Sequence, residues 1–217
     1  MKIALIGATG FVGSHVLTEL VSRGHAVTAI SRNPEKLVSD NKLVTSKRGD
    51  VFNEEEFAKL VEGHDAVISA YNPGWTNPDI YNEFLAGAQA IQSAVKKSGV
   101  KRILIVGGAG SLEIAPGVQL VDTPEFPEHI KPGATSARDY FNILKKDTDL
   151  DWTFLSPAIE MHQGTSGVRR GSYRTGLNNP VFDESGRSVL SVEDLAIAIA
   201  DEIESPQFIQ KRFTAAY

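Results

Sequence analysis

The sequence contains no cysteine, which excludes disulfides, thiolate metal sites and a cysteine nucleophile. Its five histidines do not show the spacing typical of zinc ligands, so we expect no metal site. No apolar run approaches the roughly 18 residues that a membrane helix needs. The apolar run 3–6 ends at Gly7 and is too short for the hydrophobic region of a signal peptide. These absences favour a cytoplasmic protein without a membrane span.

Positive charge is also scarce. The 22 lysines and arginines are outnumbered by 27 aspartates and glutamates, which gives a net charge of −5. Such a chain has no general attraction for a phosphate backbone, so nucleic acid is not an expected partner. A length of 217 residues suits one domain with a sizeable core. We therefore expect a small-molecule partner, and the choice between monomer and dimer stays open.

Short apolar runs alternate with segments of helical periodicity. The runs lack polar alternation, as is typical of strands that are covered on both faces. The candidate strands are 3–6, 26–30, 43–46, 66–69, 103–106 and 152–155. The candidate helices are 11–22, 54–61, 80–97 and 136–146, with a later one that runs to residue 203. This order predicts an α/β fold: a Rossmann-type, doubly wound, mostly parallel sheet, with 1–217 as a single domain.

Two local signals mark helix starts, and two irregular segments interrupt the alternation. Asn53 and Ser191 each precede an acidic residue by three positions, which predicts two N-caps. The segments 108–133 and 160–187 lack periodicity, and each follows the carboxyl end of a predicted strand. Ligands bind at that edge of open α/β sheets. We expect these two loops to form the substrate side, as a small C-terminal lobe.

The first strand leads into a glycine-rich turn, Gly7-Ala8-Thr9-Gly10-Phe11-Val12-Gly13. Gly7 permits a tight turn, Gly10 lets the backbone approach a pyrophosphate, and Gly13 lets the helix pack closely. The helix N-terminus then offers free N–H groups to phosphates. The Lys-Ser/Thr pair of an ATP-binding loop is missing. The position directly after an N-terminal strand favours dinucleotide binding, and the alternative is an ordinary tight turn.

The end of the second strand indicates which dinucleotide binds. A site selective for NAD usually has an acidic residue here to bind the ribose hydroxyls. This chain has Ser31, Arg32 and Asn33, with Lys36 one turn later. Arginine forms charge-assisted hydrogen bonds with a 2′-phosphate, whereas a carboxylate repels it. The pattern predicts NADP(H) in preference to NAD(H), and the alternative is a pair of solvated surface cations.

Further cofactor contacts are expected after the third, fourth and fifth strands. Asp50 and Val51 are placed to meet the adenine. Small residues after the fourth strand allow close approach to the ribose and pyrophosphate. The expected contacts in these three segments are Asp50, Val51, Ser69, Ala70, Tyr71 and Gly108. For Asp50 the alternative is a helix cap, and for Tyr71 it is a simple loop start.

At these residues the chain resembles the atypical short-chain dehydrogenase/reductase superfamily. It is most similar to the NAD(P)H-binding branch that contains NADH-flavin reductases, biliverdin-reductase-B-like enzymes and NmrA-like proteins. The segments that carry the resemblance are 7–13, 31–34, 49–51, 106–111, 150–158 and 191–196. The resemblance spans essentially the whole chain and implies a nicotinamide cofactor, with a flavin as a potential substrate.

The sequence departs from the better-known enzymes of that superfamily, which use Tyr-x-x-x-Lys for proton transfer. Trp75 follows Tyr71 by four residues, and the residue four positions after each of Tyr81, Tyr140 and Tyr173 is leucine. The usual epimerase or alcohol dehydrogenase chemistry is therefore not expected. A flavin or quinone ring accepts hydride and can take its proton from water.

These observations predict an NAD(P)H-dependent oxidoreductase with a flavin-like or quinone-like acceptor. The alternative is a non-catalytic redox sensor of NmrA type, and an epimerase or dehydratase with an unconventional base ranks below both. Three residues are candidates for the acceptor side: Ser111, Tyr140 and His162. Ser111 resembles the serine that orients substrate in the superfamily. The alternatives are a turn serine, a core or surface tyrosine and an exposed loop histidine.

Overall fold

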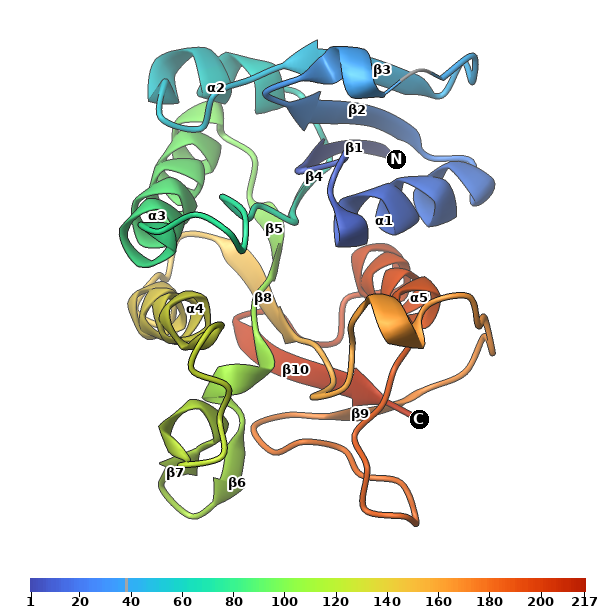
Figure 1. Ribbon diagram of the computed structural model, residues 1–217. Coiled ribbons are helices and arrows are strands. Elements are labelled where there is room, and N and C mark those ends of the chain that lie inside the picture. Colours follow the sequence, from blue (N-terminus) through green and yellow to red (C-terminus); the bar gives the residue numbers. More distant parts are fainter. Residues whose placement is uncertain (38) are drawn as a thin grey trace.

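A computed structural model of the protein describes residues 1–37 and 39–217 (Figure 1). Its main sheet has eight strands: β1 (Lys2–Ile6), β2 (Ala26–Ser31), β3 (Val44–Arg48), β4 (Ala66–Ser69), β5 (Arg102–Val106), β8 (Asp151–Ser156), β9 (Arg174–Gly176) and β10 (Lys211–Ala216). The α-helices of the described residues are α1 (Phe11–Ser22), α2 (Glu54–Val61), α3 (Ile80–Ser98), α4 (Lys131–Leu144) and α5 (Val192–Glu204). None of them is long and apolar enough to cross a membrane.

The strand order is β3-β2-β1-β4-β5-β8-β10-β9. All neighbouring strands are parallel except β9, which runs antiparallel to β10. From β1 the chain first builds outward through β2 and β3, and then returns to place β4 on the other side. In open α/β sheets, ligands bind beyond the carboxyl ends of the strands on either side of such a reversal, which here are β1 and β4. The fold is the predicted Rossmann-type α/β architecture.

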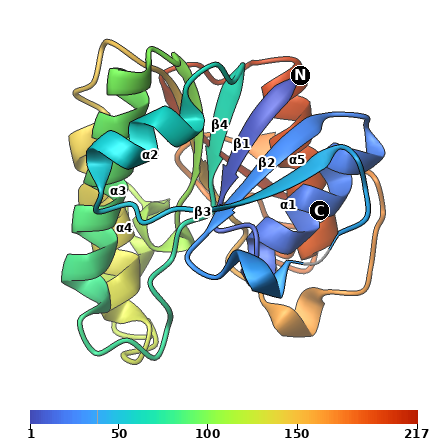
Figure 2. The ribbon, with the colours of Figure 1, turned by 90° about the horizontal axis from the view of Figure 1, so that it is seen from above.

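Helices cover both faces of the sheet, as Figure 2 shows from above. α1 and α5 pack together on one face, and α2, α3 and α4 form a layer on the other. The central strand supplies both cores: Ile3 and Leu5 face the α1 and α5 side, whereas Ala4 and Ile6 face the other layer. Both faces of β1 are buried under helices, which explains why its apolar residues do not alternate with polar ones.

The two irregular segments contain some regular structure and contact each other. Segment 108–133 contains the hairpin of β6 (Glu113–Ala115) and β7 (Val118–Gln119). Segment 160–187 contains β9. The backbone N–H of Glu113 donates to Asn178 O at 2.8 Å, and Asn179 Nδ2 donates back to Glu113 O at 2.8 Å. The two irregular segments are therefore joined directly by backbone and side-chain hydrogen bonds.

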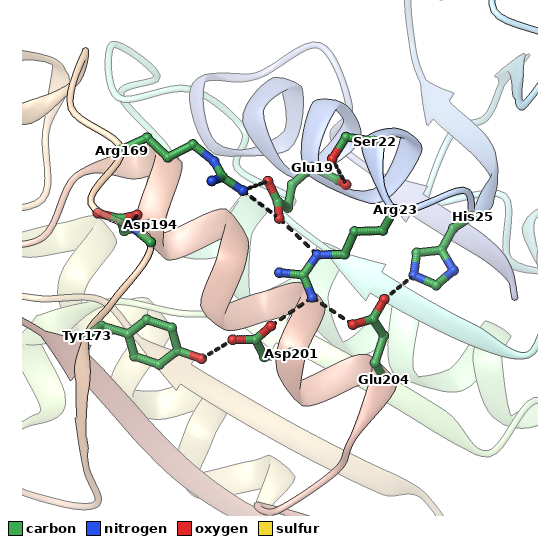
Figure 3. A network of polar contacts seen from close by, with 10 residues as sticks. Glu19, Ser22, Arg23, His25, Arg169, Tyr173, Asp194, Asp201 and Glu204 are labelled. Carbon is green, nitrogen blue, oxygen red and sulfur yellow. Dashed lines mark hydrogen bonds and ion pairs between the residues drawn. The ribbon is translucent and has the colours of Figure 1, made fainter.

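A network of ion pairs and hydrogen bonds connects segment 160–187 to helices α1 and α5 (Figure 3). Arg23, the C-cap residue of α1, contacts Glu19 at 2.8 Å and Asp201 of α5 at 2.7 Å. From the segment 160–187, Arg169 reaches Glu19 at 2.9 Å and Tyr173 Oη donates to Asp201 at 2.6 Å. The segment is thus held to two helices by side chains that are distant in the sequence.

Two elements differ from the sequence-based expectation. α4 begins at Lys131, five residues before the predicted start, because a proline in the first turn of a helix costs no hydrogen bond. β10 was not predicted at all. It begins with two cations and has only one large apolar residue, Phe213, but pairing with β8 and β9 buries most of it.

Candidate functional site

The turn after β1 requires glycine at its first position. Gly7 has φ of 78°, and a Cβ built there would lie 2.5 Å from Ala70 O. The turn is closed by Gly10 N, which donates to Gly7 O at 2.9 Å. Ala70 N in turn donates to Ile6 O at 3.0 Å, which brings the end of β4 against the turn. The first glycine is therefore held close to the fourth strand.

α1 begins directly against this turn. A Cβ at Gly13 would lie 2.1 Å from Gly7 O, so the helix can approach only without a side chain there. A Cβ at Gly10 would meet nothing nearer than Gly7 O at 3.3 Å, and Thr9 and Gly10 are exposed. Ala8 is buried, and Phe11 and Val12 are half-buried in the same turn.

The N-terminus of α1 is open to a ligand. Its N-cap residue makes no side-chain capping bond, and its first turn contains no acidic residue. The N–H groups of a first helical turn need a partner, and the helix dipole makes that end attractive to anions. The geometry therefore fits a phosphate group that approaches over Gly10.

The end of β2 presents an unpartnered hydroxyl and free cations. Ser31 Oγ is buried and has no hydrogen-bond partner among the described residues. Arg32 is exposed, and within the described part of the chain it makes no ion pair. Asn33 and Lys36 are also exposed, at the two sides of a 3₁₀ turn. A polar, anionic group bound here would meet both a hydroxyl and a guanidinium.

Three predicted residues from different strand ends lie close to one another. The pKa of Tyr71 is raised to about 12, mainly by burial and also by the nearby charges of Glu83 and Asp50, whereas Arg32 acts in the opposite sense. Tyr71 Oη donates to Glu83 O at 3.2 Å, which holds the ring against α3. Asp50 is exposed, and its Oδ1 accepts from Phe52 N at 3.0 Å.

The remaining predicted cofactor residues line the same edge of the sheet. Ser69 and Val51 are buried beneath it, whereas Ala70 is half-buried next to Gly7. Gly108 follows β5 by two residues, and a Cβ there would have only Ala137 Cβ within contact, at 3.7 Å. The backbone at Gly108 therefore leaves room for a ligand at the end of β5.

The structure places the three acceptor-side candidates in different surroundings. Ser111 is buried in a 3₁₀ turn after β5, and its Oγ accepts from Arg212 Nη1 at 2.9 Å. Tyr140 does not face a cleft: it is 1% exposed in the core between α4 and the sheet, and burial raises its pKa. The prediction for Tyr140 is corrected accordingly, because the packing of α4 against the sheet places this position in the core.

His162 is exposed in the segment after β8, as its alternative interpretation expected. Its Nδ1 accepts from Gly164 N at 3.0 Å, and Thr165 completes the cap of a short 3₁₀ turn. The ring thus serves local backbone structure. Arg212, which contacts Ser111, was missed by sequence reasoning, and its one signal was a cation within an otherwise unassigned segment.

Metal-binding geometry was also searched for. Within residues 1–37 and 39–217, no group of three or more histidine, aspartate or glutamate side chains is placed to hold a metal ion.

Comparisons with known proteins agree with this geometry. The NAD(P)H-binding family model matches residues 7–206. The chain is 38% identical over 216 residues to protein YwnB of Bacillus subtilis (strain 168), and the alignment covers 99% of this chain and 97% of that protein. The match therefore spans the glycine-rich turn Gly7–Gly13 and both irregular segments.

Two solved structures are similar over the full chain. A provisionally assigned epimerase from Bacteroides thetaiotaomicron has a TM-score of 0.92 and 46% identity, covering 100% of this chain and 96% of that one. A provisionally assigned NADH-flavin reductase from Streptococcus pneumoniae TIGR4 has a TM-score of 0.84 and 32% identity, covering 100% and 99%. With the glycine-rich turn, the sheet order and the family match together, the chain belongs to the NAD(P)H-binding family, in the atypical branch of the short-chain dehydrogenases/reductases.

Proposed function

We propose that the protein is an NADPH-dependent reductase whose acceptor is a flavin-like or quinone-like ring. The observation that carries the choice of cofactor is the end of β2, where the unpaired Arg32 stands beside the unpartnered Ser31 hydroxyl. An NAD-selective site has a carboxylate in this place. A 2′-phosphate would supply the countercharge for Arg32 and the missing partner for Ser31.

The turn Gly7–Gly13 and the N-terminus of α1 would hold the pyrophosphate, and Asp50 and Tyr71 flank the adenosine side. When bound, NADPH supplies a hydride. The chain has no Tyr-x-x-x-Lys pair, and Tyr140 is in the core. An acceptor ring that takes its proton from water suits such a site, because the protein then has only to orient the two rings and to exclude side reactions.

The similarity to the Streptococcus pneumoniae protein favours this acceptor class over a sugar. The similarity to the Bacteroides thetaiotaomicron protein favours epimerase chemistry, which needs a base. Ser111 and Tyr140 are buried, and the Nδ1 of the exposed His162 already accepts a hydrogen bond from Gly164 N. We therefore prefer the reductase.

The test combines equilibrium binding with turnover. The purified protein is titrated with NADPH and NADH, and NADPH oxidation is then followed with FMN, FAD and menadione. We expect tighter binding of NADPH and acceptor-dependent oxidation. Binding without turnover would instead favour a redox sensor of NmrA type, and an absence of binding would contradict both functions.

Two glycine variants separate the cofactor contact from the fold. Gly10→Val places its side chain on the open face of the turn, so we expect loss of NADPH binding with little change in thermal unfolding. Gly13→Ala forces its Cβ to 2.1 Å from Gly7 O, so we expect loss of stability as well. Equal NADPH affinity in the Gly10 variant and the wild type would place the cofactor elsewhere.

A further inference from the structure

Arg212 of β10 carries a buried charge without a carboxylate partner. It is 5% exposed, and its guanidinium lies 4.8 Å from the centre of the Phe141 ring. Among the described residues no carboxylate lies within ion-pair distance, and Glu113 acts on its charge without contact. Arg102 of β5 is buried to a similar degree but pairs with Glu202 at 2.9 Å. An unpaired buried charge is costly, so Arg212 requires another explanation.

The hydrogen bonds of Arg212 join the two irregular segments. Nη1 donates to Ser111 O at 2.8 Å and to Ser111 Oγ at 2.9 Å, and Nη2 donates to Asn178 Oδ1 at 2.9 Å. Ser111 belongs to the first segment and Asn178 to the second. The remaining donor, Nε, has no partner in the described structure. The guanidinium therefore organises the place where the acceptor is expected, with one donor still unused.

Ser111 has an unused donor as well. Its Oγ accepts from Arg212, and its own O–H has no acceptor among the described residues. A hydroxyl that accepts from a guanidinium is polarised, and its proton points away from the cation and becomes a stronger donor. Ser111 follows the open backbone of Gly108 at the carboxyl end of β5. The polarised Ser111 hydroxyl thus belongs to the 3₁₀ turn whose N-cap is Gly108, a predicted cofactor contact.

Two more unpartnered hydroxyls lie on the same face of the sheet. Ser156 Oγ and Thr214 Oγ1 are buried without partners in the described part of the chain. The two residues are register partners on β8 and β10. Because side chains alternate along a strand, Thr214 shares a face with Arg212 two residues before it. The unmet polar groups of Arg212, Thr214 and Ser156 therefore lie on one face of the sheet, along β10 and at the carboxyl end of β8.

We infer that Arg212, acting through Ser111, is the positioning residue of an anion-stabilising end of the acceptor site. The inference rests on the proposed function and narrows its substrate class to rings with a carbonyl oxygen that becomes negative on reduction. The hydride forms a new bond to the ring, an electron pair of the ring moves onto the carbonyl oxygen, and the cofactor leaves as NADP⁺. Ser111 donates a hydrogen bond to that oxygen, Arg212 supplies the countercharge, and water later delivers the proton.

The first readout is equilibrium binding, without turnover. Hydroxynaphthoquinone is a ring whose coloured anion mimics the charged acceptor, and its absorbance reports binding. We expect Arg212→Met to bind the anion about 10- to 100-fold more weakly than the wild type. The affinity of Arg212→Lys for the anion should lie between those of Arg212→Met and the wild type. NADPH affinity should be unchanged in both variants. Unchanged binding of the anion by Arg212→Met would overturn the inference.

The second readout is a double-mutant cycle on menadione reduction. If Arg212 acts through Ser111, Arg212→Met combined with Ser111→Ala should lower kcat no further than the worse single variant, with the KM for NADPH unchanged. Independent, additive losses would contradict the coupling. Arg102→Met is the matched control, because it removes a buried arginine at the amino end of β5, away from the carboxyl ends of the strands. It should lower the unfolding temperature and leave the binding of the anion unchanged.

The outcomes also separate this inference from the proposed function. If the wild type oxidises no NADPH with any acceptor, the reductase proposal fails, while the binding of hydroxynaphthoquinone still tests Arg212. If the wild type is active but the Arg212 variants match it in both readouts, the inference alone fails. If Arg212→Met does not fold, Arg212→Lys and Ser111→Ala supply the same comparison.

Discussion

At the scale of single residues, the proposed choice of cofactor depends on side chains at the strand ends. At the end of β2, Gly49 N donates to Ser31 O at 3.1 Å, and Gly7 N donates to Ile30 O at 3.1 Å. These bonds hold the backbone of three strand ends together and leave the side chains of Ser31 and Arg32 free for a ligand. Cofactor selection at this position should therefore depend on side-chain charge and little on backbone conformation.

Replacing Arg32 by aspartate tests this selection. We expect NADPH to bind about 10- to 100-fold more weakly, because a charge-assisted hydrogen bond is lost and a carboxylate repels the 2′-phosphate. NADH should be affected much less. Titration of both dinucleotides measures the difference. Lys146→Asp, the same charge change at an exposed residue after α4, is the control, and equal weakening of NADPH and NADH by the Arg32 variant would contradict the assignment.

At the scale of the elements, the starts of α2 and α5 show how similar sequence signals reach different outcomes. Ser191 Oγ accepts from Asp194 N at 3.1 Å, so the predicted N-cap of α5 is confirmed. Asn53 is the N-cap residue of α2, as predicted, but its side chain makes no capping bond: its Nδ2 donates to Glu56 Oε2 at 2.7 Å instead. The asparagine amide can donate to the carboxylate, and this side-chain pair replaces the capping box.

Truncation of Ser191 and of Asn53 to alanine should lower the free energy of unfolding by different amounts. Ser191→Ala should lower the free energy of unfolding by about 1 kcal/mol, because a helix N–H loses its acceptor. The same variant also removes the hydrogen bond from Tyr217 Oη to Ser191 Oγ at 2.9 Å, whereas Asp194 Oδ2 remains as an acceptor for that hydroxyl. Asn53→Ala should change it by less than about 0.5 kcal/mol. Urea denaturation followed by circular dichroism compares them, and a larger loss in the Asn53 variant would disagree with the observed geometry.

Across the whole molecule, the network in Figure 3 joins the beginning of the chain to its last helix. Glu204 of α5 contacts Arg23 at 2.6 Å and His25 Nε2 at 2.7 Å. Burial opposes ionisation of Glu204, but the hydrogen bonds from His25 and Arg23 outweigh burial and hold its pKa below the usual value. The charged form of Glu204 therefore stabilises the packing of α1 against α5.

This lowered pKa predicts acid sensitivity. The unfolded chain takes up a proton at Glu204 near a pH of about 4.3, and the folded chain only at lower pH. The stabilisation that ionised Glu204 contributes is thus fully present above that pH, and it is lost as the pH falls through the lowered pKa of Glu204. Unfolding temperatures measured between neutral pH and about pH 3 should fall less steeply in Glu204→Gln than in the wild type. Glu128→Gln, at an exposed residue outside the network, should keep the wild-type slope.

The sequence alone determined the features that depend on neighbouring residues. The run 3–6 followed by three spaced glycines indicated a strand, a tight turn and a helix N-terminus, and the structure has them in those places. Helix periodicity predicted α1 and α2 with the observed bounds. These signals are readable because backbone conformation and one-sided burial act over a few residues.

The tertiary structure alone decided which side chains meet. Arg212 and Ser111 are 101 residues apart, and they contact because β10 inserts between β8 and β9. No local pattern encodes that strand order. The same holds for Tyr140, whose inward face depends on how α4 packs against the sheet. The glycine-rich turn after β1 could be predicted because it is one continuous segment, whereas the contacts of Ser111 are assembled from distant segments by long-range packing.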